Sequence, residues 1–331
     1  MTRLPNLVVT KTPLRISFLG GGTDINYFYR KHGGAVISAA IDKYVYVTVK
    51  RYSKLYKTKY RLNYSITENT DDLKKIKNNI IRECIKLSKI NFPIYISIVS
   101  DVPTGSGLGG SSSVAVGLIK ALSELKGEKI SKKQLYDLAC KVEIKKLNQP
   151  IGKQDQFPAV YGGLNFIEFK KNETVKFKKI NLSNFNKNIF KNSLLIWTEI
   201  SRSATIELLN QKKKFKKNEA NLIEIKKLLY DLKKNTKFKN VSLKLFGDYI
   251  KKSWEQKSKI IKNDKKNFIN KFIENNNEYF YATKILGAGA GGFWFFITKE
   301  NKKKKLIYRL KKYLTINISI SESGVKVISK S

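Results

Sequence analysis

Three glycine-rich segments contain the residues best suited to hold a phosphate group. They are LGGGTD at residues 19–24, PTGSGLGGSSS at residues 103–113 and GAGAGG at residues 287–292. Glycine permits positive φ angles and close backbone approach, which lets successive amides point at one anion. The second segment lies between a predicted strand and a predicted helix, so its amides and the helix dipole favour a bound triphosphate. A tight strand-to-helix turn is the alternative, although a turn requires fewer glycines and serines.

Two better-known glycine motifs do not account for these segments. Gly105, Gly107 and Gly110 match GxGxxG, but a dinucleotide fold also needs the loop after a first strand and an acidic residue about 20 positions later. Neither condition is met, which counts against a nicotinamide oxidoreductase. No segment is followed by the GK[ST] of a Walker loop. The hydroxyls of Ser111 and Ser112 are suited to reach a magnesium ion.

Two acidic residues complete the candidate site. Glu143 lies four residues after Ala139 on the buried side of a predicted helix, where an unpaired carboxylate would be costly. It therefore needs a metal ion, a structural ion pair or hydrogen bonds. Asp155 lies in the loop PIGKQDQF between Pro150 and Pro158, which suits a fixed catalytic carboxylate. The alternative for Asp155 is a turn-capping Asx motif.

The elements that must position these residues alternate between sheet and helix in the first half of the chain. Runs rich in β-branched and aromatic residues predict strands at residues 7–19, 35–52, 93–99 and 161–169. Apolar residues at spacings of three and four predict helices at residues 71–88, 112–125 and 131–150, the last beginning with a capping box of Ser131 and Gln134.

The Asn-rich segment 181–191 is the candidate boundary before a second lobe. A strand is predicted at residues 194–199 and helices at residues 204–232 and 241–261, followed by the third glycine segment and mixed structure to Val327. The sequence thus predicts two lobes, residues 1–190 and 191–331.

Composition narrows the class of protein. The net charge of +40, from 66 Lys and Arg against 26 Asp and Glu, allows a nucleic-acid-binding protein, but its lysines are dispersed and are expected on solvated helix faces. Nucleic acid is therefore not the expected partner. One histidine and two cysteines without metal-type spacing exclude zinc and disulfide frameworks. No apolar stretch reaches the ~20 residues of a membrane span, so we expect a cytoplasmic protein without a membrane partner.

The three segments, in order, resemble the motifs of a known kinase superfamily. TPLRISFLGGGTD, PTGSGLGGSSS and KILGAGAGGF are similar to the first, second and third motifs of the GHMP kinases, which include galactokinase, homoserine kinase and mevalonate kinase. The resemblance spans nearly the whole chain. It implies an α+β, two-lobed fold, with an N-terminal lobe similar to domain 2 of ribosomal protein S5 and a ferredoxin-like C-terminal lobe. It also implies ATP and Mg2+ as cofactors, a small-molecule acceptor, and a monomer or homodimer.

The resemblance implies a role for each candidate residue. Asp155 would be the catalytic carboxylate, with Arg15 beside it to stabilise the transferring phosphoryl group. Glu143 with Ser111 or Ser112 would hold magnesium. The residues expected to bind ATP phosphates are Pro103, Gly105, Ser106, Gly107, Leu108, Gly109, Gly110, Ser111, Ser112 and Ser113. The residues expected to bind substrate are Gly21, Gly22, Thr23, Asp24, Lys153, Arg202, Gly289 and Gly291.

Within the superfamily, these segments together with GGAVISAAIDKYVYV and GKQDQF most resemble the heptose-phosphate kinase branch. That implies phosphorylation of the anomeric C1 hydroxyl of D-glycero-D-manno-heptose 7-phosphate for surface polysaccharide synthesis, with a fucose or galactose kinase as the alternative. Gly21 and Gly22 replace the Glu and His of galactokinase, which argues against galactose. The 7-phosphate would need a basic clamp, for which Arg202 is the first candidate and Lys43 or Arg30 are alternatives.

Overall fold

The structure is a computed structural model, which describes residues 4–53, 55–199, 204–261, 272–289 and 291–331. Its larger sheet has the strand order β12-β1-β2-β5-β3-β4, with β6 paired to β2 and β7 paired to β6. The strands are β1 (Leu7–Leu19), β2 (Gly34–Arg51), β3 (Tyr60–Asn63), β4 (Thr67–Thr70), β5 (Ile94–Ser100), β6 (Leu164–Phe169), β7 (Val175–Ile180) and β12 (Lys326–Lys330).

Two long strands form the centre of this sheet. β1 and β2 pair antiparallel from Leu7 opposite Lys50 to Leu19 opposite Ile37, with register shifts after Pro13 and after Ser17. One half of β2 pairs with β5 and the other half with β6. Because β1 is buried along most of its length, a side chain on it that faces the cleft is held rigidly.

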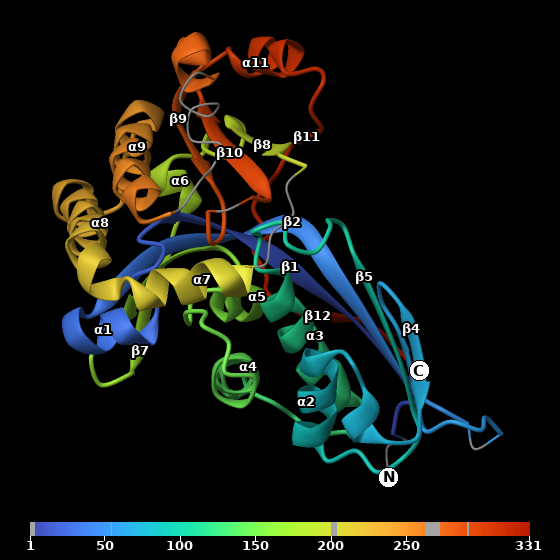
Figure 1. Cartoon of the computed structure of the whole chain (residues 1–331). Helices are drawn as coiled ribbons and strands as arrows, with labels where there is room; N and C mark the ends of the chain where they lie inside the picture. Colours follow the sequence, from blue (N-terminus) through green and yellow to red (C-terminus); the bar gives the residue numbers. More distant parts are fainter. Residues whose placement is uncertain (1–3, 54, 200–203, 262–271, 290) are drawn as a thin grey trace.

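Helices cover one face of the larger sheet, and α3 packs directly on β1 and β2 (Figure 1). The helices of this half are α1 (Asn26–His32), η1 (Leu73–Lys75), α2 (Asn79–Ser88), α3 (Gly110–Leu125), α4 (Lys132–Cys140), the π-helix η2 (Lys141–Lys146), α5 (Gln156–Tyr161) and α6 (Leu182–Phe185). Thus the helix that follows the second glycine segment rests on the central strands.

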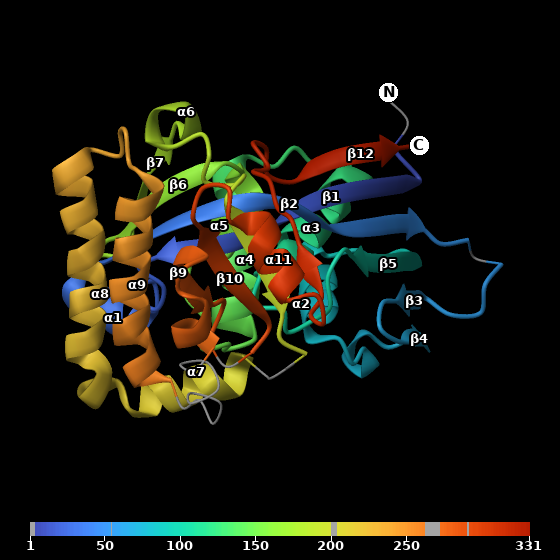
Figure 2. The same cartoon turned by 90° about the horizontal axis from the view of Figure 1, so that it is seen from above.

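The second sheet has the antiparallel order β11-β8-β10-β9. Helices α8 and α9 lie side by side, and α9 packs on β9 (Figure 2). The elements are β8 (Ser193–Trp197), α7 (Ala204–Lys213), α8 (Phe215–Thr236), α9 (Leu243–Ile260), β9 (Phe280–Ile285), β10 (Phe293–Thr298), α11 (Lys303–Arg309) and β11 (Thr315–Ile316). Phe18 of β1 contacts Phe246 of α9 and Phe295 of β10 at ring-centroid distances of 5.4 and 5.5 Å, so one apolar core connects both sheets.

Most predicted elements are confirmed, including the α+β class and the capping box of Ser131 and Gln134. The prediction of a strand beginning at residue 161 is wrong, because α5 extends to Tyr161 and β6 begins at Leu164. Pro158 falls in the first turn of α5, where a missing amide hydrogen costs nothing. The predicted helix 71–88 is the short turn η1 followed by α2, which begins only at Asn79. The predicted helix 131–150 is α4 followed by the π-helix η2, which ends at Lys146. The predicted helix 204–232 is two helices, α7 and α8.

The last strand, β12, joins the sheet of the predicted first lobe. It belongs by sequence to the predicted second lobe, residues 191–331, yet it pairs antiparallel with β1. The division into residues 1–190 and 191–331 therefore stays a prediction. Among the described residues, none of the helices combines the length and apolarity needed to cross a membrane.

Candidate active site

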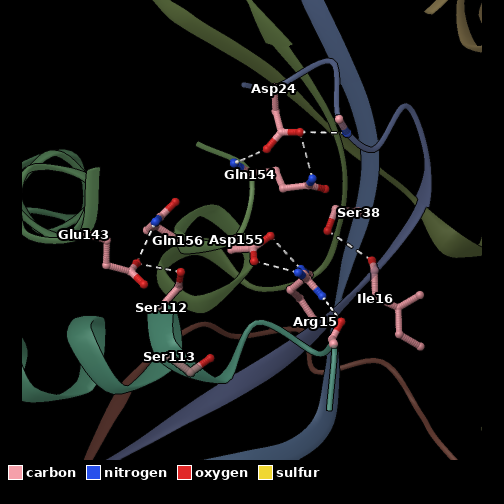
Figure 3. Close-up of polar contacts among 12 residues, drawn as sticks. Arg15, Ile16, Asp24, Ser38, Ser112, Ser113, Glu143, Gln154, Asp155 and Gln156 are labelled. Carbon is pink, nitrogen blue, oxygen red and sulfur yellow. Dashed lines mark hydrogen bonds and ion pairs between the residues drawn. The ribbon is translucent and has the colours of Figure 1, made fainter. Parts of the chain in front are cut away.

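An arginine and an aspartate 140 positions apart in the sequence form the centre of the site. Arg15 Nε donates to Asp155 Oδ1 over 2.8 Å, and Arg15 Nη2 donates to Asp155 Oδ2 over 2.6 Å (Figure 3). The Arg15 side chain is 6% exposed and that of Asp155 is 18% exposed. Such a bidentate pair fixes the plane of the carboxylate. Both residues line a cleft of about 890 Å³.

The second glycine segment forms one wall of this cleft. Gly105, Gly107 and Gly109 all have positive φ angles, of 74°, 77° and 75°. Gly109 is the N-cap of α3 and makes no side-chain cap hydrogen bond, so the first amides of this 16-residue helix are available to an anion. The segment residues that line the cleft are Pro103, Thr104, Gly105, Ser106, Gly107, Gly109, Gly110 and Ser111. The geometry therefore fits phosphate better than a simple turn.

Backbone contacts hold the glycine wall against Arg15. Arg15 Nη1 donates to the Gly107 carbonyl over 2.6 Å, and the Arg15 amide donates to the Leu108 carbonyl over 2.9 Å. A Cβ on Gly109 would lie 3.0 Å from Cγ of Arg15. The loop and the ion pair thus form one rigid unit.

The third glycine segment packs on the second. The Phe293 amide donates to the Ser106 carbonyl over 3.0 Å, and a Cβ on Gly107 would lie 2.8 Å from the Leu286 carbonyl oxygen. Gly291 lines the cleft. Gly289 instead packs against Ile261, whose Cδ1 lies 2.1 Å from the position a Cβ would take. This segment therefore supports the phosphate wall, and the position of Gly289 does not favour its predicted contact with substrate.

Glu143 is fully buried on the π-helix η2. Its Oε2 accepts hydrogen bonds from Ser112 Oγ over 2.6 Å and from Gln156 Nε2 over 2.7 Å (Figure 3). Its Oε1 is one of the buried polar atoms without a hydrogen-bond partner in the described part of the chain. Burial raises the pKa of Glu143 to about 7, against the opposing effects of Ser112, Gln156 and Ser111. Among residues 4–199 and the later described ranges, no lysine or arginine pairs with it, which argues against the structural ion pair.

Asp24 lies on the other side of the ion pair in the same cleft. It is 2% exposed, and its carboxylate accepts hydrogen bonds from the Gly22 amide over 3.1 Å and from Gln154 Nε2 over 2.9 Å. Burial, and then the negative charge of Asp155, raise the pKa of Asp24 to about 6. A Cβ on Gly152 would lie only 1.8 Å from Asp24 Oδ2, so glycine is required for this close approach.

Several predicted site residues point elsewhere. The single hydroxyl proton of Thr23 is shared between the carbonyls of Gly20 and Ala35, and Ser113 Oγ donates to the carbonyl of Pro13. Neither residue is among those that line the cleft, nor is the buried Leu108. Their proposed contacts with substrate or ATP would involve the backbone only.

The predicted substrate residue Lys153 and the predicted phosphate clamps Arg30 and Lys43 are not found in the cleft among the described residues. Lys153 Nζ lies 3.5 Å from Glu173 Oε2, Arg30 pairs with the same glutamate, and Lys43 lies 3.5 Å from Asp42 Oδ1. None of these cations lines the cleft. Arg202 lies outside the described residues.

Two cleft lysines were missed by the sequence analysis. Lys257 lies on α9 and Lys284 on β9, and both line the cleft. Lys284 is the first residue of the segment KILGAGAGGF. Its position just before a glycine-rich loop could have indicated that it lies near the site. Lys257 lies among other lysines of a predicted amphipathic helix, and only the three-dimensional structure distinguishes it.

The fold and cleft have the features of a phosphotransferase, since fixed amides and charged groups converge where charge would develop. A family model, the GHMP kinases N terminal domain, matches residues 76–163. Over 337 aligned residues the chain is 33% identical to D-glycero-alpha-D-manno-heptose 7-phosphate kinase of Campylobacter jejuni, covering 96% of this chain and 97% of that protein. The chain belongs to the GHMP kinase family.

Solved structures show the same fold. A D-glycero-D-manno-heptose 1-phosphate kinase from Bacteroides thetaiotaomicron has a TM-score of 0.77 at 22% identity, covering 97% of this chain and 99% of that one. A putative sugar kinase from Campylobacter jejuni has a TM-score of 0.67 at 27% identity, covering 100% of both chains. The family model and the relative that is 33% identical confirm the predicted kinase class.

Proposed function

We propose that this protein is an ATP-dependent kinase that phosphorylates the anomeric C1 hydroxyl of D-glycero-D-manno-heptose 7-phosphate, giving the 1,7-bisphosphate. The observation that carries the proposal is the Arg15–Asp155 pair, which lies in one cleft with the glycine wall and Asp24. The relative that is 33% identical supports a heptose phosphate as the acceptor. We expect the enzyme to act in the cytoplasm, in the synthesis of surface polysaccharide.

In this proposal Asp155 accepts the proton of the acceptor hydroxyl. Arg15 donates one hydrogen bond to each oxygen of the Asp155 carboxylate. The remaining lone pairs of these oxygens are free to accept from the hydroxyl. The acceptor oxygen forms a bond to the γ-phosphorus while the bond from that phosphorus to the bridging oxygen breaks, and ADP leaves with the electron pair. The Arg15 charge offsets negative charge that spreads over the phosphoryl group.

The residues around Glu143 fit a magnesium ion. The orphaned oxygens Glu143 Oε1 and Gln156 Oε1 are buried beside the hydroxyl of Ser112, and oxygen atoms are the ligands that Mg2+ prefers. The described residues hold no cluster of three His, Cys, Asp or Glu side chains. Glu143 and Ser112 do not line the cleft, but Ser111 does, so nucleotide phosphates on that side would supply the remaining ligands. When bound, the ion neutralises phosphate charge; Glu143 would hold it, with Ser112 or Ser111.

An acceptor panel tests this proposal. ADP release is measured with heptose 7-phosphate, unphosphorylated heptose, fucose and galactose, each with ATP and magnesium. We expect the highest kcat/KM for heptose 7-phosphate. Equal turnover of galactose would overturn the substrate assignment, and steep salt-dependent duplex binding without ADP release would overturn the kinase assignment.

A further inference from the structure

Among the described residues, two lysine ammonium groups of the cleft have no carboxylate partner within 4.0 Å. Lys257 Nζ donates to Gln211 Oε1 over 3.0 Å, and Lys284 Nζ donates to the carbonyls of Ser17 and Phe18 over 3.0 and 3.1 Å. Across the described ranges, neither lysine forms a salt bridge within 4.0 Å. Because an ammonium has three donors, these contacts leave two on Lys257 and one on Lys284.

The position of Lys257 is fixed by its surroundings. Gln211 is 4% exposed, and its Nε2 donates to Glu207 Oε1 over 2.9 Å and to the Ala288 carbonyl over 3.2 Å. These bonds turn the amide oxygen of Gln211 toward Lys257. A lysine held by a buried amide is more restricted than a surface lysine, so its ammonium is prepared to bind an anion.

Burial disfavours the charged form of both lysines. Burial lowers the pKa of Lys257 to about 8, although the charges of Asp24 and Glu207 oppose it. Burial also lowers the pKa of Lys284 to about 7, and the positive charges of Lys257 and Arg15 add to the effect. An anion between the two lysines would relieve both the burial cost and the mutual repulsion.

The location favours the acceptor over ATP. A Cβ on Gly22 would lie 3.1 Å from Lys257 Nζ, and the Gly22 amide is bonded to Asp24. Lys284 is anchored to β1 only a few residues after Arg15. The glycine wall at the start of α3 already offers its amides to ATP phosphates.

We propose that Lys257 and Lys284 form a cationic clamp for a phosphate group on the acceptor, and so make the enzyme select a phosphorylated sugar over the free sugar. This inference rests on the proposed kinase function, and it names the residues that bind the phosphate group of the acceptor. Together the lysines offer three hydrogen-bond donors, which matches the three terminal oxygens of a phosphate monoester.

Kinetics with Lys257→Met and Lys284→Met provides the test. For each variant we expect the KM for heptose 7-phosphate to rise by about 10- to 100-fold, at least about tenfold more than any change in the KM for ATP or in the kcat/KM for unphosphorylated heptose. Lys252→Met removes the same charge from an exposed position of α9 and should leave all values unchanged. A rise in the KM for ATP alone, or an equal loss with both acceptors, would overturn the clamp.

A binding measurement tests the lysine clamp independently of which sugar is the substrate. Saturating ADP and magnesium occupy the nucleotide site, and inorganic phosphate is then titrated while the Tm is recorded. The wild type should be stabilised, whereas the Lys257→Met, Lys284→Met double variant should not. If this difference appears without turnover of heptose 7-phosphate, only the proposed substrate fails. Equal responses of the two proteins, including no response in either, would refute the clamp.

Discussion

Replacing the buried carboxylate Glu143 by Gln should stabilise the protein and impair catalysis. Burial raises the pKa of Glu143 from 4.5 to about 7, and each pKa unit corresponds to about 1.36 kcal/mol. The charged form therefore lowers the free energy of unfolding by about 3 kcal/mol at pH 8. Glutamine keeps an oxygen that can accept from Ser112 and Gln156 but carries no charge.

The pH dependence has a definite sign. Because the folded-state pKa lies above the unfolded value, the stabilisation from neutral Glu143 is complete below pH 4.5 and is lost as the pH rises through about 7. Urea unfolding without nucleotide or magnesium should show Glu143→Gln gaining over wild type between pH 5 and pH 8, by a total of about 2 to 3 kcal/mol. Its turnover with magnesium and ATP should fall at least about 100-fold.

Glu255→Gln is the matched control, since Glu255 is exposed on α9. It removes the same carboxylate chemistry from a solvated position and should change neither the unfolding profile nor turnover. A stability difference between Glu143→Gln and wild type that stays constant from pH 5 to pH 8 would refute the reasoning. Full activity of Glu143→Gln would remove this residue from the magnesium site.

Three further predictions test the rest of the cleft. Asp155→Asn should reduce turnover by at least about a thousandfold while ATP affinity, measured by calorimetry, stays nearly constant; preserved turnover would contradict the proton-accepting role. Gly107→Ala combines a φ of 77° with a backbone oxygen 2.8 Å from the new Cβ and should weaken ATP binding and cost about 1 to 3 kcal/mol of stability. Gly110→Ala, whose Cβ meets nothing within 4 Å, should leave stability unchanged or raise it, and similar losses in both variants would argue against steric strain. Gly152→Ala places a Cβ 1.8 Å from Asp24 Oδ2, so the acceptor KM should rise more than the ATP KM; equal rises would indicate general unfolding.

Local patterns were enough to predict the elements that carry the site. Alternation and β-branching give β1 its observed bounds, Leu7–Leu19, and apolar spacing places a helix directly after the second glycine segment. The burial of Glu143 also follows from its position beside Ala139 on a helix stripe. These features depend on residues that are close together in the sequence, so local patterns are enough to predict them.

The remaining site features depend on contacts between distant segments. Lys257 and Gln211 lie 46 positions apart, and nothing in their local sequence indicates that one fixes the other. The approach of Gly152 to Asp24 and the packing of the third glycine segment on the second are likewise tertiary. The short helix α5 was missed because Pro158 and the flanking glycines indicate a loop when read locally.

The pairing of β12 with β1 has a consequence for folding. β1 carries Arg15, yet its outer edge is covered by a strand separated from it by the whole of residues 20–325. Closing so long a segment has a large entropic cost, and non-local pairings of this kind form late and slowly. The edge of β1 at Val8–Lys11 is therefore sealed late in folding, which leaves it exposed to mispairing during biosynthesis.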